Sequence, residues 1–215
     1  STSASYNCGS LMNRPAVPDG LDVPLEIGGR FLPAPEVEAW VRDQILGEDG
    51  ALNNPDHEHL QMAEIGFLWT NVPAKRKQRA IIGQAELVRS SGDPWGAARR
   101  NQQMVEWFGD IPDFVVTLYA PYCAEADDRA FAALVEHELY HCGQALDAYG
   151  MPRFDRQTGQ PVFDLRGHDV EEFVGVVERY GTANPGVGAM VAAALTDPEV
   201  GEAEIAQACG NCLKA

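Results

Sequence analysis

The stretch from Ala132 to Tyr149 reads AALVEHELYHCGQALDAY and contains the pentapeptide His137-Glu138-Leu139-Tyr140-His141. Residues four apart lie on the same face of an α-helix, so the imidazoles of His137 and His141 can bind one metal ion. Glu138 lies one step round the helix, where its carboxylate can take a proton from metal-bound water. The pentapeptide therefore predicts a zinc site with two histidine ligands and a glutamate as the general base.

The residues around the pentapeptide favour a helix. Apolar side chains recur at helical spacing from Phe131 to Leu146. Asp127 and Asp128 are typical of a helix start, and Gly150 is typical of a helix end. We therefore expect one helix that continues through the pentapeptide and ends at Gly150. The alternative is an ordinary core helix that happens to carry two histidines.

A catalytic zinc has a third protein ligand and keeps its fourth position for water. His168 is the preferred candidate, because it follows a predicted hairpin that can fold the chain back and stands at the start of a predicted helix. Glu171 and Glu172 are the rivals, since a glutamate from a second helix serves equally well in such sites. The expected cofactor is one Zn²⁺ per chain.

Several polar residues could support this site. Imidazoles that bind a metal usually donate their other N–H group to a carboxylate or carbonyl, and peptide hydrolysis needs a donor for the oxyanion. The candidates for contacts to the site or the substrate are Asp164, Arg166 and Asp169, and those for the oxyanion donor are Tyr119, Tyr140, Tyr149, Arg166 and Tyr180. The sequence does not choose among them.

The remaining chain alternates between helical and extended patterns. The strand segments at 63–71 and 79–88 are separated by the polar residues 72–78 and are expected to form an antiparallel pair. His57 and His59 are interpreted as part of a polar helix start or loop. We expect helices at 35–46, 94–108 and 169–180 and C-terminal helices at 185–195 and 198–208. A third strand is expected at 113–120, and a hairpin at 152–165 with its turn at Gly159. The buried face of the 169–180 helix should consist of Val170, Phe173, Val174 and Val177. This order of elements predicts an α+β fold.

Length and composition bound the domain organisation. Residues 1–30 are rich in Gly, Pro, Ser and Asn and are interpreted as an irregular or flexible arm. We expect residues 31–215 to form a single domain that ends in helices from about residue 182. Five cysteines without regular spacing favour a reducing compartment. Cys209 and Cys212 are interpreted as a terminal disulfide or as two free thiols.

The charge of the chain bears on its partners. Sixteen basic against 32 acidic residues give a net charge of -16, which disfavours binding to a phosphate backbone. No apolar run is long enough for a membrane span, and the N-terminus lacks the pattern of a signal peptide. We therefore expect a cytoplasmic protein with no membrane partner. The basic residues Lys75, Arg76, Lys77 and Arg79 are interpreted as a solvated turn.

The segment from Phe114 to Gly181 resembles the phage metallopeptidases and, more distantly, the SprT-like zinc proteases. It carries FVVTLYAPYC, LVEHELYHC and RGHDVEEFVGVVERYG, with the predicted hairpin before the last of these. In SprT-like proteins a third histidine follows a hairpin-like insertion and precedes a Gly-x-x-Phe sequence. Here His168 matches that histidine, Asp169 replaces the glycine, and one extra residue precedes Phe173. With a weaker similarity at the first two strands, the resemblance covers residues 60–181.

The resemblance implies a zincin-like α+β fold, in which a small antiparallel or mixed sheet packs on the HExxH helix with additional helices. It also implies a zinc metallopeptidase acting on a protein or peptide substrate. SprT-like proteases act on DNA-bound proteins, but the net charge disfavours that substrate here. Two alternatives stay open: a non-catalytic zinc-binding protein-interaction module of phage or mobile-element origin, and a metal-dependent hydrolase of other substrates. A phage-encoded protein would act in the cytoplasm of the bacterial host.

Overall fold

A computed structural model describes residues 13–76, 78–89, 92–170, 174–182 and 185–203 of the chain. Its centre is a four-stranded sheet with the strand order β1-β2-β6-β5. The strands are β1 (Phe31–Pro33), β2 (Ile65–Thr70), β5 (Gly83–Leu87) and β6 (Phe114–Tyr119). β2 and β6 are parallel, whereas β1 and β5 are antiparallel to their neighbours. The predicted α+β class with a small mixed sheet is therefore confirmed.

The predicted pairing of the strands at 63–71 and 79–88 is wrong, because β6 lies between β2 and β5. β2 and β5 do run in opposite directions, but both form hydrogen bonds to β6. All six residues of β2 are buried, whereas β5 exposes Glu86, so β2 is suited to the interior of the sheet and β5 to its edge. The intervening chain forms a short hairpin of β3 (Lys75–Arg76) and β4 (Arg79–Ala80).

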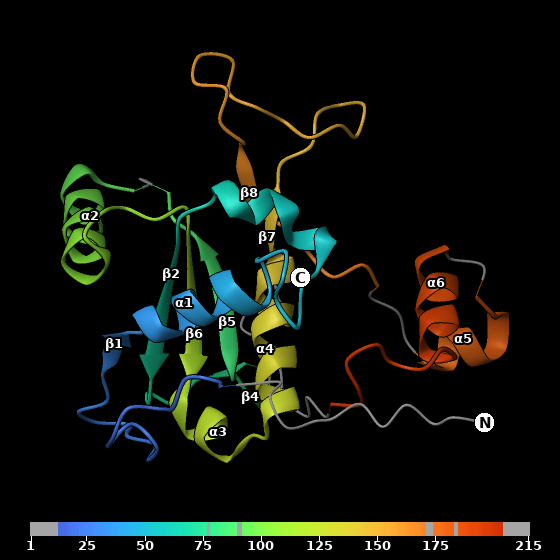
Figure 1. Cartoon of the computed structure of the whole chain (residues 1–215), viewed down its shortest axis with the longest axis horizontal. Coiled ribbons are helices and arrows are strands. Elements are labelled where there is room, and N and C mark those ends of the chain that lie inside the picture. The colour runs from blue at the N-terminus through green and yellow to red at the C-terminus, as the bar shows by residue number, and fades with distance from the viewer. Residues whose placement is uncertain (1–12, 77, 90–91, 171–173, 183–184, 204–215) are drawn as a thin grey trace.

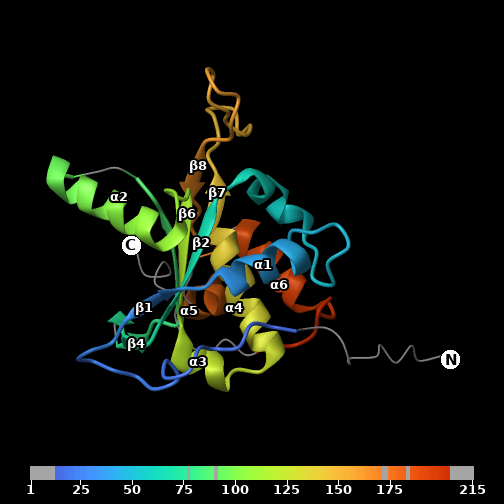
Figure 2. The same ribbon diagram turned by 60° about the vertical axis from the view of Figure 1, so that its left-hand side comes forward.

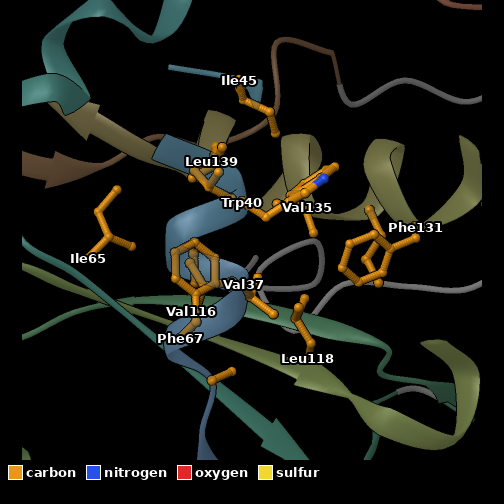
Figure 3. Close-up of a cluster of buried hydrophobic side chains, with 14 of the residues drawn as sticks. Val37, Trp40, Ile45, Ile65, Phe67, Val116, Leu118, Phe131, Val135 and Leu139 are labelled. Atoms are coloured by element: carbon orange, nitrogen blue, oxygen red, sulfur yellow. The ribbon is translucent and has the colours of Figure 1, made fainter. Parts of the chain in front are cut away.

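Helices cover both faces of the sheet (Figures 1 and 2). Helix α1 (Pro35–Gln44) and helix α4 (Asp128–His141) lie on one face, and helix α2 (Pro94–Phe108) lies on the other. On the α2 face, the ring of Phe108 lies directly against the backbone of Gly66. Figure 3 shows the core between α1, α4 and the sheet; its labelled side chains include Val37 and Trp40 from α1, Phe67, Val116 and Leu118 from the sheet, and Phe131, Val135 and Leu139 from α4.

Asp127 caps the N-terminus of helix α4, because its carboxylate accepts a hydrogen bond from the amide of Ala130 at 2.8 Å. The expected continuation of this helix to Gly150 is wrong, because the helix ends at His141. The next residues form β7 (Cys142–Gln144), which pairs antiparallel with β8 (Phe163–Leu165). A Cβ atom at Gly143 would lie 3.2 Å from Cβ of Arg166, so the glycine permits this close pairing.

The chain between β7 and β8 forms a long hairpin arm, residues 145–162, which projects away from the sheet (Figure 1). Isolated bridges join Leu146 to Pro152 and Phe154 to Pro161 along this arm. The predicted turn at Gly159 is confirmed, and its φ of +71° is one that glycine adopts without strain. The arm carries exposed apolar side chains, because it lies outside the main core.

The remaining elements are the 3-10 helix η1 (Pro55–Met62) and the helices α3 (Ala120–Glu125), α5 (Val174–Tyr180) and α6 (Pro185–Ala194). The helices predicted at 35–46, 94–108 and 185–195 are confirmed within two residues. Val174 is exposed, so its assignment to a buried face is wrong. Of the helix predicted at 198–208, residues 198–203 are not helical and the rest lie outside the described residues. Among the described residues, no helix has the length and apolarity needed to cross a membrane.

Residues 13–30 form neither a helix nor a strand. They are nevertheless packed against the domain, because Leu21 is 0% exposed and belongs to the main core. The side chain of Asn71 anchors the same segment. Its Oδ1 accepts a hydrogen bond from the amide of Arg30, and its Nδ2 donates one to the carbonyl of Val23, both at 3.0 Å. This segment therefore contributes to the core of the domain.

Candidate metal site

Helix α4 and the segment after β8 bring three histidines together. His137 and His141 lie one turn apart on α4, and His168 approaches them from the returning chain. Nε2 of His168 lies 3.4 Å from Nε2 of His137. The ligand nitrogens of all three residues lie within 4.8 Å of one another. We call these three residues the histidine cluster.

The histidine cluster fits a zinc ion. Zinc binds imidazole nitrogen at about 2.0–2.1 Å with tetrahedral geometry, which places two ligand nitrogens about 3.4 Å apart. The His137 and His168 nitrogens already have that separation. His141 is buried, His137 is half-buried and His168 is exposed, so one side of the cluster faces solvent. The donor set and its open side suit a metal ion with a free coordination position.

The backbone of Arg166 orients His141. Nδ1 of His141 lies 2.7 Å from the carbonyl oxygen of Arg166, which can only accept a hydrogen bond, so Nδ1 carries the proton. In the neutral imidazole this leaves Nε2 of His141 unprotonated and available for a metal. In return, the amide of Arg166 donates to the carbonyl of His141 at 2.9 Å. The β7–β8 hairpin therefore both returns the chain to α4 and fixes the tautomer of one candidate ligand.

The protonation state of His137 also suits metal binding. Burial, together with repulsion from His141 and His168, lowers the pKa of His137 to about 4. The imidazole is therefore neutral near pH 7, which is the form that binds a metal.

Glu138 lies against strand β5 and is 0% exposed. A Cβ atom at Gly83 would meet Oε1 of Glu138 at 2.6 Å, so this strand position leaves no room for a side chain. Burial raises the pKa of Glu138 to about 8, and the backbone amide of Ala85 offsets part of that rise. Neither carboxylate oxygen makes a hydrogen bond of ordinary geometry within the described chain. The glutamate of the pentapeptide is thus a buried group that favours its neutral form.

A polar cluster fastens η1 to the outer side of α4. Nδ2 of Asn54 donates to Oε1 of Glu136 at 2.6 Å and to the hydroxyl of Tyr140 at 3.0 Å, and that hydroxyl donates to Asp56 at 3.0 Å. His57 is buried beside them, with Nε2 3.7 Å from Oε1 of Glu136 and its ring edge-on to Tyr140. Burial opposes ionisation of Glu136, but His57 and Asn54 outweigh it and lower the pKa of this carboxyl.

This polar cluster was not foreseen from the sequence. The only local signal is Asn54 before Pro55, which is typical of a helix start, and the Asn54 side chain does accept from the amide of Asp56. His57 and His59 lie outside the histidine cluster. Nε2 of His59 instead lies 2.8 Å from the carbonyl of Cys142 and joins η1 to β7. Gly83 was also missed, although an isolated glycine in a strand often marks a close approach.

The other candidate residues are placed as follows. Arg166 forms an ion pair with Asp169, and Asp164 forms one with Arg89. Tyr149 is exposed on the hairpin arm, and Tyr119 is partly buried at the end of β6. Glu171 and Glu172, the rival ligands, lie outside the described residues, as does the side chain of Tyr180.

Comparisons with known proteins bear on the class of the protein. No curated protein and no solved structure matches this chain. The family described as "Putative phage metallopeptidase" matches residues 31–195, from β1 to the end of α6. This match covers more than half of the chain and includes the whole histidine cluster together with Glu138. The chain belongs to the phage metallopeptidase family.

Proposed function

We propose that this protein is a zinc-dependent metallopeptidase that hydrolyses peptide bonds. The observation that carries the proposal is the convergence of His137, His141 and His168, with Glu138 on the same helix as two of them. Membership of a metallopeptidase family supports a protein or peptide substrate. The mixed sheet packed against the HExxH helix is compatible with a zincin-like fold.

The three imidazoles would hold the ion, and His141 is oriented for this by the carbonyl of Arg166. When bound, zinc supplies a Lewis acid that acidifies water and polarises a carbonyl group. Glu138 would accept the proton of the attacking water at a carboxylate oxygen and deliver it to the nitrogen of the leaving amine. In the metal-free protein its pKa of about 8 keeps Glu138 mostly protonated at neutral pH, so the carboxyl must release that proton before it acts as the base. A bound cation would lower this pKa and favour the carboxylate.

Arg166 and Tyr140 are our candidates for contacts to the substrate carbonyl. The guanidinium of Arg166 is paired with Asp169 and lies 5.8 Å from the centre of the Tyr140 ring. The hydroxyl of Tyr140 is already engaged by Asn54 and Asp56, so Arg166 is the more available donor. Asp169 would then hold the guanidinium in position. Tyr149, on the hairpin arm, is the third candidate.

One observation favours a second function, the non-catalytic zinc-binding interaction module. Glu138 is 0% exposed, whereas a general base must reach a water molecule. In a module of this kind the zinc would stabilise the fold and the exposed surfaces would bind a partner. Replacing Glu138 by Gln separates the two functions, because it removes the base and leaves the three histidines unchanged.

The deciding experiment measures zinc by mass spectrometry together with cleavage of casein and of a quenched fluorescent peptide library. We expect one zinc per wild-type chain, loss of zinc in His168→Ala, and full zinc in Glu171→Ala, Glu172→Ala and the control His59→Ala. Glu138→Gln should keep its zinc and lose cleavage at least a hundred-fold. Zinc loss in Glu171→Ala or Glu172→Ala, with zinc retained in His168→Ala, would identify that glutamate as the third ligand in place of His168. Full zinc without cleavage by the wild type would favour the interaction module.

A further inference from the structure

A cleft of about 850 Å³ lies beside the histidine cluster, bounded by η1, the last turn of α4 and the β7–β8 hairpin. Its size is within the range of ligand-binding sites in proteins. The residues that define its character are Asp56, Glu58 and Met62 from η1 and Leu146, Phe154 and Arg166 from the hairpin. The proposed hydrolysis does not use most of these residues.

Two residues that line the cleft adjoin the histidine cluster. Tyr140, the residue before His141, lies on the wall of the cleft. Arg166 also lines the cleft, and its carbonyl oxygen receives the hydrogen bond from His141. A ligand that contacts Tyr140 or Arg166 in the cleft therefore binds next to residues that adjoin the candidate metal ligand His141.

The walls of the cleft are partly apolar. Leu146 is 59% exposed, and Met62 and Phe154 are also exposed. They come from η1 and from the hairpin arm, so apolar surface faces the cleft from two separate elements. Such surface gains from contact with apolar side chains of a ligand.

The charges in the cleft leave an excess of negative charge. Arg166 is paired with Asp169, and Asp164 is paired with Arg89. Asp56 and Glu58 are exposed and have no ion-pair partner among the described residues. Carboxylates in this setting attract a cationic side chain and disfavour an anionic one. The complementary ligand therefore carries a lysine or arginine together with apolar side chains.

We propose that this cleft is the substrate-recognition groove and that it takes a polypeptide segment in which a lysine or arginine is flanked by apolar residues. The assignment as a substrate groove rests on the proposed peptidase function. The binding preference itself depends only on the chemistry of the cleft, so it can be measured without turnover.

The probes are two fluorescein-labelled nonapeptides, one with a central lysine flanked by leucine and phenylalanine and the other with glutamate in place of that lysine. Their binding to full-length Glu138→Gln protein is followed by fluorescence anisotropy. We expect the lysine peptide to bind at least ten-fold more tightly than the glutamate peptide. Adding Glu58→Lys should reduce that preference to about two-fold or less, and adding Leu146→Asp should weaken the binding of the lysine peptide at least five-fold.

The controls are Glu199→Lys and Leu195→Asp, because both residues are exposed and lie outside the cleft. These two changes should leave both affinities within two-fold of the parent. Equal binding of the two peptides by the parent, or an unchanged preference in Glu58→Lys, would overturn the proposed groove even if the wild type cleaves peptides. Selective binding that Glu58→Lys abolishes, without cleavage by the zinc-loaded wild type, would support the groove and overturn the peptidase function.

Discussion

Gly83 on strand β5 and Glu138 on helix α4 lie so close together that a Cβ atom at position 83 would come within 2.6 Å of Oε1 of Glu138. The backbone of Gly83 cannot easily retreat, because the strand is paired with β6 opposite Leu118. A second contact, 2.9 Å to Cδ1 of Leu134, closes the same space. The edge strand therefore sets the position of the proposed general base.

Gly83→Ala is expected to displace the Glu138 carboxylate and to lower kcat for peptide cleavage at least ten-fold while zinc binding is retained. The matched control is Gly188→Ala on α6, where, among the described residues outside that helix's own backbone, the new Cβ atom would meet the carbonyl of Thr182 at an ordinary 3.6 Å. This control should keep kcat and gain up to about 1 kcal/mol in helix stability. Steady-state kinetics and zinc content check both variants, and an unchanged kcat in Gly83→Ala would argue against this positioning.

Glu138→Gln is expected to stabilise the metal-free protein at alkaline pH. Burial raises the folded-state pKa of Glu138 to about 8 from an ordinary value of 4.5, so the folded state holds a proton that the unfolded state releases. Wild-type stability attributable to this group is complete below pH 4.5 and is lost as the pH rises to about 8. Once the pH exceeds 8 the loss is on the order of 5 kcal/mol, at about 1.4 kcal/mol per pKa unit.

Urea unfolding in the presence of a chelator, at pH 5 and pH 8.5, measures this difference. Glu138→Gln should unfold at a clearly higher urea concentration than the wild type at pH 8.5, with a much smaller difference at pH 5. His137 also titrates in the acidic range, but it is present in both proteins and cancels. The control Glu58→Gln, at an exposed position, should unfold at the same urea concentration as the wild type at both pH values. A pH-independent difference would contradict the assigned shift.

Local patterns in the sequence predicted the elements that depend on neighbouring residues. The HExxH spacing predicted a helix that presents His137 and His141 on one face, and Gly159 predicted the turn of the hairpin arm. The return of His168 to that helix also followed from this hairpin. In each case the residues that determine the conformation lie within the element itself or next to it.

Contacts between distant segments were not predictable in this way. The pairing of Gly143 with Asp164 overrides the apolar period that suggested a longer helix, and that pairing forms only in the folded chain. Likewise, β6 separates β2 and β5, because a strand apolar on both faces gains most from a central position. The burial of His57 depends on Glu136 and Tyr140, far along the chain, and no local pattern in 53–60 encodes it.

Leu21→Ala is expected to destabilise the protein by about 2–5 kcal/mol, as a large-to-small change at a fully buried position. Leu21 is 0% exposed although it lies in a segment without regular structure. Val23→Ala, two residues away and 56% exposed, should change stability by less than about 0.5 kcal/mol. Urea unfolding compares the two. Similar small effects in both variants would show that residues 13–30 contribute little to the core.

Asn54→Ala should weaken the attachment of η1 to α4, because it removes two kinds of interaction at once. The side-chain oxygen of Asn54 caps η1 at the amide of Asp56, and its Nδ2 group donates to Glu136 and Tyr140. We expect a loss of about 2–3 kcal/mol, of which the cap accounts for about 1 kcal/mol. Asn54→Ser is the matched variant, since a serine hydroxyl restores the cap but cannot reach both partners on α4. Urea unfolding should therefore place it between the wild type and Asn54→Ala, whereas stability equal to that of the wild type would reduce the role of Asn54 to capping alone.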